Sequence, residues 1–121
     1  MIGIKIGIIS SLLTVVIGAF GAHGLKNILL ENKTADIFQT AVRYQMFHSI
    51  ALIISGILLN HGLVDSKFSI YLFLSGILIF SGSLYILSIS GIKWLGAITP
   101  IGGVLFILGW GLLFISLKSN S

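Results

Sequence analysis

Three polar side chains with useful chemistry lie close together in the segment TAVRYQMFHSIAL, residues 40–52. Arg43 carries a permanent positive charge, Gln45 both donates and accepts hydrogen bonds, and His48 can donate, accept or take up a proton. On an α-helix Gln45 and His48 share a face at spacing i, i+3, whereas Arg43 points about 150° away from them. The segment therefore holds two features rather than a single site.

Gln45 and His48 lie deep within an apolar run. His48 follows Ile37 by about 16 Å at about 1.5 Å per helical residue, too far for an easy reach to the membrane surface. Polar side chains at such depth normally face neighbouring helices and form hydrogen bonds to them. We favour this interhelical role for both residues. The alternative is a binding site for a ligand, a proton or water, because buried ionisable groups in membranes are often functional.

Arg43 shares its face with Gln39 and Asp36, which precede it by four and seven residues. Its long side chain can reach the headgroup region, where it would bind a lipid phosphate or pair with Asp36. We therefore expect Asp36 and Arg43 to form a headgroup or ion-pair site. A functional ion pair inside the protein is the alternative.

The composition places the whole chain in a membrane. Charged residues make up 8% of the sequence and hydrophobic residues 56%, whereas soluble domains carry about 25% charged residues. The basic residues stand singly between apolar segments, which is typical of membrane-edge anchors and excludes a nucleic-acid-binding patch. The sequence contains no cysteine, which excludes disulfides and cysteine-based metal sites.

Apolar stretches over residues 4–22, 37–60, 68–90 and 94–117 each approach the roughly 20 residues that cross a bilayer as a helix. The connections at 61–67 and 91–93 are short, and short loops join antiparallel neighbours. The sequence therefore predicts a single all-α domain over residues 1–121, an integral membrane four-helix up-down-up-down bundle with both termini on one side.

The first stretch has a second interpretation. Lys5, the apolar run and the small residues GAFGA at 18–22 also resemble a secretory signal peptide. We favour a transmembrane helix that stays in the protein.

The connection between the first two stretches predicts a short amphipathic helix. Leu25, Ile28 and Leu29 recur at helical spacing, with Lys26 and Glu31 on other faces. Such a helix is expected to lie in the headgroup region. The lysines are nearly balanced between the two ends of the bundle, so the positive-inside rule only weakly favours a cytoplasmic location for the first and third connections.

An antiparallel arrangement would bring most polar residues into one half of the membrane. We expect a polar pocket there, open towards the first and third connections. Its candidate residues are His23, Gln45, His48, Ser81, Ser83, Tyr85 and Thr99.

We expect no catalytic, cofactor or metal site. The carboxylates Glu31, Asp36 and Asp65 lie in loops or at helix ends, and His61 is at the end opposite to His23 and His48. Two histidines lack the third ligand that a catalytic zinc requires.

Small residues are spaced for close helix packing. The first stretch carries a stripe of Gly, Ser, Thr and Ala, and pairs such as Gly102 and Gly109 recur later. Spacings of this kind bring helix backbones together, either within one chain or between copies. We expect contacts with membrane lipids and a homo-oligomer through these stripes.

Four motifs carry a resemblance to a known family: GAFGAHGL (18–25), FQTAVRYQMFHSIAL (38–52), FSGSLYIL (80–87) and TPIGG (99–103). In this order and spacing they resemble the small membrane proteins of the YgdD/transmembrane-protein-256 family, over nearly the full chain. The resemblance implies a four-helix membrane protein whose biochemical activity is essentially unassigned. It also marks as motif positions the candidate pocket residues named above, together with Pro100.

Three functions remain open at this stage. The first is a non-enzymatic protein of a bacterial plasma membrane that supports membrane or envelope integrity through lipid or protein contacts. The second is a small-solute or proton pathway that uses His23, Gln45 and His48. A membrane-embedded enzyme ranks last, because a single deep histidine without a carboxylate partner offers few of the groups that catalysis requires.

Overall fold

The structure, a computed structural model, describes residues 1–118 of the chain. Within these residues it is helical throughout, apart from turns and one isolated bridge between Val64 and Leu117. The helices are α1 (Ile2–Val16), the π-helix η1 (Ile17–Gly21), α2 (Ala22–Gly24), α3 (Lys26–Asn32), α4 (Ala35–Asn60), α5 (Phe68–Gly76), the π-helix η2 (Ile77–Ser81), α6 (Gly82–Ser90), the 3-10 helix η3 (Lys93–Ala97) and α7 (Thr99–Ser116).

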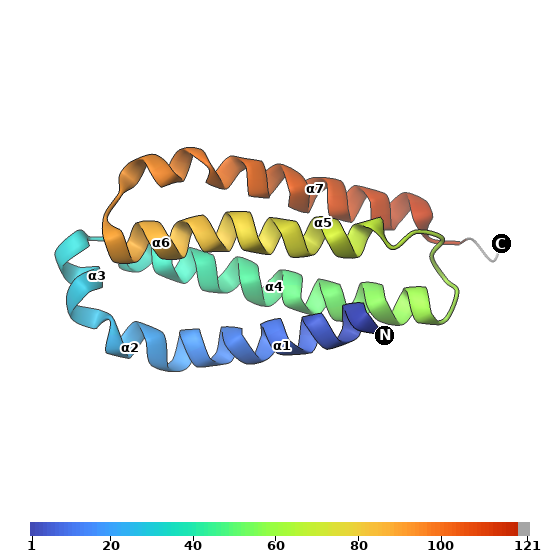
Figure 1. Ribbon diagram of the computed structural model, residues 1–121, viewed down its shortest axis with the longest axis horizontal. Helices are drawn as coiled ribbons and strands as arrows, with labels where there is room; N and C mark the ends of the chain where they lie inside the picture. The colour runs from blue at the N-terminus through green and yellow to red at the C-terminus, as the bar shows by residue number, and fades with distance from the viewer. Residues whose placement is uncertain (119–121) are drawn as a thin grey trace.

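These elements form four membrane-spanning helices, as the sequence predicted. The spans are Ile2–Gly24, Ala35–Asn60, Phe68–Ser90 and Lys93–Ser116, each long and apolar enough to cross a membrane. Successive spans run antiparallel, and the N-terminus lies at the same end of the molecule as the end of α7 (Figure 1). The predicted all-α, up-down-up-down fold is confirmed.

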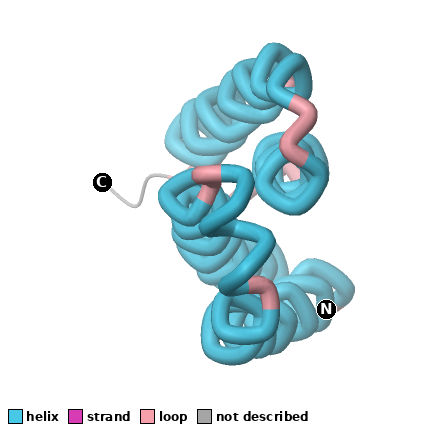
Figure 2. The backbone as a smooth tube through the Cα atoms, turned by 90° about the vertical axis from the view of Figure 1, so that its left-hand side faces the viewer, coloured by secondary structure: helices cyan, strands magenta, loops and turns pink. Residues whose placement is uncertain are grey.

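The spans form a zigzag row rather than a closed square (Figure 2). α4 lies inside the row and packs against α1 on one side and against α5, η2 and α6 on the other. α7 packs on α5 and η2 at the far edge of the row. The main apolar core includes Leu52 of α4, Phe73 of α5 and Phe106 of α7. Because the row is open, a groove is left between α4 and α7.

Glycines set the close approach of neighbouring spans. A Cβ atom at Gly7 would lie 2.9 Å from the backbone nitrogen of Ile53, and one at Gly102 would lie 2.5 Å from the backbone nitrogen of Phe80. No side chain fits at such distances without a shift of the backbone. Parts of the predicted small-residue stripes thus pack inside one chain, and association of copies through them stays a prediction.

Two π-helical segments interrupt the spans at Ile17–Gly21 and Ile77–Ser81. Neither was predicted, because the sequence carries no proline or insertion that would mark them. π-segments inside α-helices occur frequently at functional sites. The second one ends at Ser81, whose hydroxyl donates a 2.8 Å hydrogen bond to the carbonyl oxygen of Ala41 on α4.

The predicted amphipathic segment is the helix α3, but its apolar face packs against the protein. Leu29 is buried with Phe38 and Val42 of α4. Asn32, the last residue of α3, donates to the carbonyl oxygen of Ser88 at 3.2 Å. The side chain of Thr34, just beyond α3, donates to the same oxygen at 2.7 Å. These donors satisfy carbonyl groups that the end of α6 leaves free.

The fourth span begins with a 3-10 turn. The α-helix proper starts at Thr99, with Pro100 in its first turn. Proline at this position breaks no helical hydrogen bond and has a dihedral angle suited to a helix start. The predicted helix 94–117 is therefore divided, and α7 covers its larger part.

Candidate functional site

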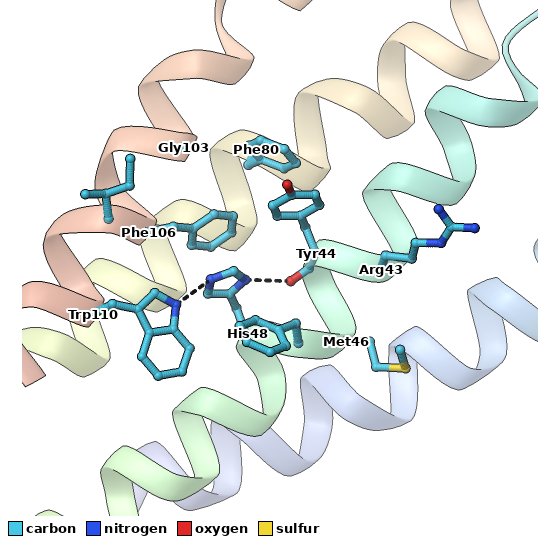
Figure 3. A pocket seen from close by; sticks show the side chains of 10 residues that line it. Arg43, Tyr44, Met46, His48, Phe80, Gly103, Phe106 and Trp110 are labelled. Atoms are coloured by element: carbon cyan, nitrogen blue, oxygen red, sulfur yellow. Dashed lines mark hydrogen bonds between the residues drawn. The ribbon is translucent and has the colours of Figure 1, made fainter.

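His48 is the buried polar centre of the contact between α4 and α7. Its Nδ1 lies 2.9 Å from the carbonyl oxygen of Tyr44, and the indole nitrogen of Trp110 donates to its Nε2 at 3.0 Å (Figure 3). A carbonyl oxygen only accepts and an indole N–H only donates. The two contacts therefore assign the hydrogen to Nδ1 and describe a neutral imidazole with both nitrogens engaged.

Aromatic rings surround this imidazole. The ring of Phe106 stacks on it with centroids 3.5 Å apart and planes 10° from parallel. Phe47 and Phe73 approach with centroids at 5.2 Å and 5.7 Å. His48 is only 4% exposed, so its ring is part of the packed wall between the two helices.

The same wall forms the floor of a groove of about 670 Å³ between α4 and α7. Its outer residues are open to the surroundings, with Met46 50%, Phe47 58% and Ile107 71% exposed. These exposed positions belong to the membrane-spanning helices α4 and α7. The lining consists of Arg43, Tyr44, Met46, Phe47, His48, Phe80, Gly103, Phe106, Ile107 and Trp110 (Figure 3).

Arg43 is the one charged residue in this lining. Both Arg43 and Asp36 are exposed. Within residues 1–118 the only ion pair joins Lys118, just after α7, and Asp65, in the connection between α4 and α5, 3.2 Å apart. The ion pair between Asp36 and Arg43 that was considered from the sequence is therefore not formed.

Gln45 faces a different part of the protein from His48. Its side-chain nitrogen donates to the carbonyl oxygen of Ser10 at 3.3 Å, and its side-chain oxygen accepts from the hydroxyl of Tyr85 at 2.6 Å. The hydroxyls of Ser10 and Ser49 lie 2.6 Å apart beside it. This network joins α1, α4 and α6 through polar atoms that are already engaged with one another.

The remaining predicted pocket residues lie in further separate places. Ser83 and Thr99 form a hydroxyl pair at 2.7 Å between α6 and α7, and Ser81 is bonded to α4 as described above. His23, in the short helix α2, is exposed. The structure therefore places the predicted pocket residues at several separate positions, and of them only His48 lines the groove.

The groove also contains residues that the sequence did not single out. Phe106 and Trp110 stand four residues apart on α7, a spacing that places two side chains on one helix face. This spacing was the available signal, but it does not say which helix the face meets. Residues 1–118 contain no group of three or more His, Cys, Asp or Glu side chains that could hold a metal ion.

Comparisons with known proteins identify relatives along most of the chain. A family model described as "Protein of unknown function (DUF423)" matches residues 17–103. A UPF0382 membrane protein of Staphylococcus haemolyticus is 45% identical over 113 residues, which cover 93% of this chain and 92% of the relative. The UPF0382 membrane protein YwdK of Bacillus subtilis is 42% identical over 115 residues, 93% of either chain. No solved structure matches the chain.

These relatives agree with the membrane architecture described above. These comparisons do not confirm the YgdD/transmembrane-protein-256 name, although a small membrane family of unknown function is compatible with it. Bacterial relatives that are named membrane proteins, together with four helices able to span a membrane, identify a multi-pass protein of the plasma membrane. The chain belongs to the DUF423/UPF0382 family of bacterial membrane proteins, whose function is unknown.

Proposed function

We propose that the protein is a non-enzymatic membrane protein that holds a lipid hydrocarbon chain in the groove between α4 and α7. Through this contact it supports the integrity of the membrane. The groove itself is the observation that carries the proposal, because it is concave, lined mainly by aromatic and aliphatic side chains, and open on the outer surface of membrane-spanning helices. Sites with these properties are the usual binding places for apolar ligands.

The arrangement of the polar residues also favours this function over a solute or proton pathway. Gln45 is bonded both to Ser10 and to Tyr85, and both nitrogens of His48 are engaged. Polar groups that satisfy one another hold helices together, whereas a pathway needs polar groups that face a water-sized space. None of Gln45, Tyr85 and Ser10 lines the groove.

A groove-filling substitution tests lipid binding. A Cβ atom at Gly103 would meet only the ring of Phe80, at 3.9 Å, so Gly103→Leu adds a side chain to the groove without a backbone clash. Gly111→Leu is the matched control on the same helix, because no atom lies within 4 Å of its added Cβ and Gly111 is outside the groove.

The measurement is native mass spectrometry of protein released from lipid nanodiscs. We expect the wild type and Gly111→Leu to retain a lipid molecule and Gly103→Leu to lose most of it. A wild type released without lipid, or equal retention by both variants, would count against the proposal.

The physiological part of the proposal has its own test. Deletion of the gene is expected to increase the sensitivity of the cells to detergent and osmotic stress. Wild-type protein should restore resistance, and Gly103→Leu should restore less of it than Gly111→Leu. Unchanged envelope behaviour in the deletion strain would contradict a role in membrane integrity.

A further inference from the structure

We propose that the groove selects an anionic phospholipid and that Arg43 is the residue that binds its phosphate. This inference rests on the proposed function, since it names the chemical class of the lipid held there. It is carried by the position of Arg43, by its lack of a carboxylate partner and by the chemistry of its guanidinium group.

The groove has a charged end and an apolar end. On α7 its lining runs from Gly103 to Trp110, a rise of about 10 Å at about 1.5 Å per residue. α7 begins at the end of the molecule that carries α3 (Figure 1). Gly103 is close to this beginning, and Trp110 lies further along the helix and therefore deeper. Arg43 occupies the early half of α4, at the same end as α3. The cation thus stands towards the membrane surface and the aromatic floor towards the membrane interior.

The depth of Arg43 suits a lipid phosphate. It lies eight residues after Ala35, the first residue of α4, or about 12 Å along the helix axis. An arginine side chain at this depth extends towards the headgroups while its methylene groups stay among apolar atoms. A phosphate bound there places the attached acyl chains beside Phe80, Phe106 and Trp110.

The charge of Arg43 is available for such a ligand. The side chain is exposed, and in the described part of the chain no carboxylate oxygen lies within 4.0 Å of it. Arg43 is also the only arginine in the sequence. A guanidinium group binds phosphate oxygens through two parallel hydrogen bonds, whereas an ammonium group acts as a point charge.

The net charge of the headgroup decides the class of lipid. All common phospholipids carry the phosphate, but in a phosphatidylcholine the attached ammonium already neutralises it. The groove lining supplies a cation and no carboxylate. A headgroup with net negative charge, such as a phosphatidylglycerol, therefore gains more from Arg43 than a zwitterionic one does.

The test uses the full chain in nanodiscs that contain equal amounts of phosphatidylglycerol and phosphatidylcholine. Lipid adducts released with the protein are identified by mass. We expect the wild type to retain phosphatidylglycerol with an enrichment over phosphatidylcholine of about fivefold. This is the order of magnitude by which one basic residue strengthens binding at an anionic surface. Arg43→Gln should bring the enrichment close to one, and Arg43→Lys should leave an intermediate value.

Lys93→Gln is the matched charge control. Lys93 is exposed, is the first residue of η3, and lies outside the groove lining. This variant should keep the enrichment of the wild type. Equal loss in Arg43→Gln and Lys93→Gln would overturn the proposal, because the preference would then reflect net charge rather than a site.

The outcomes separate this inference from the proposed function. Retained lipid without enrichment, or enrichment that survives Arg43→Gln, would leave lipid binding in the groove intact and overturn the role of Arg43. No retained lipid in the wild type would overturn both.

Discussion

The indole nitrogen of Trp110 lies 3.0 Å from Nε2 of His48, and this hydrogen bond joins the middle of α7 to the middle of α4. Phe106, one turn earlier on α7, stacks on the same imidazole. The contact between the two helices is therefore specified by the hydrogen bond from Trp110 and by the stacked ring of Phe106. It forms the deepest part of the groove that we propose for lipid.

Removal of the indole donor should weaken this contact. Trp110→Phe keeps an aromatic ring but leaves Nε2 of the buried His48 without a partner, and we expect the free energy of unfolding to fall by about 1 kcal/mol. Trp94→Phe is the control, because Trp94 is 66% exposed, and it should change stability by less than about 0.5 kcal/mol. Unfolding in mixed micelles measures both, and equal effects would show that the hydrogen bond is unimportant.

Gln45 and Tyr85 should be energetically coupled. The hydroxyl of Tyr85 donates to the side-chain oxygen of Gln45 at 2.6 Å, and interhelical bonds of this kind in membranes average about 0.6 kcal/mol. A double-mutant cycle with Gln45→Leu and Tyr85→Phe should give a coupling of this order. Additive effects of the two substitutions would mean that the bond contributes nothing to stability.

Close packing at Gly102 should not tolerate a methyl group. An added Cβ would meet the backbone nitrogen of Phe80 at 2.5 Å, and we expect Gly102→Ala to destabilise the protein by about 1–3 kcal/mol. Gly111→Ala has open space around its Cβ and should be neutral or stabilising, since alanine favours a helix by up to about 1 kcal/mol. The same unfolding assay tests the contrast, and a stable Gly102→Ala would contradict this packing.

Tryptophan fluorescence provides an independent test of lipid binding in the groove. The sequence has two tryptophans, so Trp94→Phe leaves Trp110 as the sole indole. Bromine atoms on lipid acyl chains should quench this residue, because Trp110 lines the groove and is 36% exposed. Addition of Gly103→Leu should reduce the quenching, whereas Gly111→Leu should not. Quenching that is equal in both variants would argue against a chain held in the groove.

The membrane spans could be predicted from the sequence because length and hydropathy act locally. The stretches 37–60 and 68–90 match the observed spans to within two residues at each end. The π-segment at Ile77–Ser81 could not be predicted, since nothing in its residues ILIFS marks a change of helix type. The bond from Ser81 to the carbonyl oxygen of Ala41 depends on the tertiary arrangement and could not be predicted either.

The site was harder to predict from the sequence than the spans, because it depends on which helices face each other. Gln45 and His48 were placed on one face, and both are buried. α4, however, lies inside the zigzag, so a rotation of about 60° between the two positions directs Gln45 to α1 and α6 and His48 to α7. Helical periodicity gives such a rotation but not the identity of the neighbours on either side.

The open row of helices also bears on how the protein is assembled. α1 and α4 pack on each other through Gly7 and Gly56, and α5 and α7 do so through Gly76 and Gly109. Each pair is a helical hairpin with its backbone hydrogen bonds satisfied internally, as insertion into a bilayer requires. The connection at 61–67 that joins the two hairpins lies at one end of the molecule. We therefore expect two separately synthesised halves of the protein to find each other within the membrane and to restore the groove at their junction.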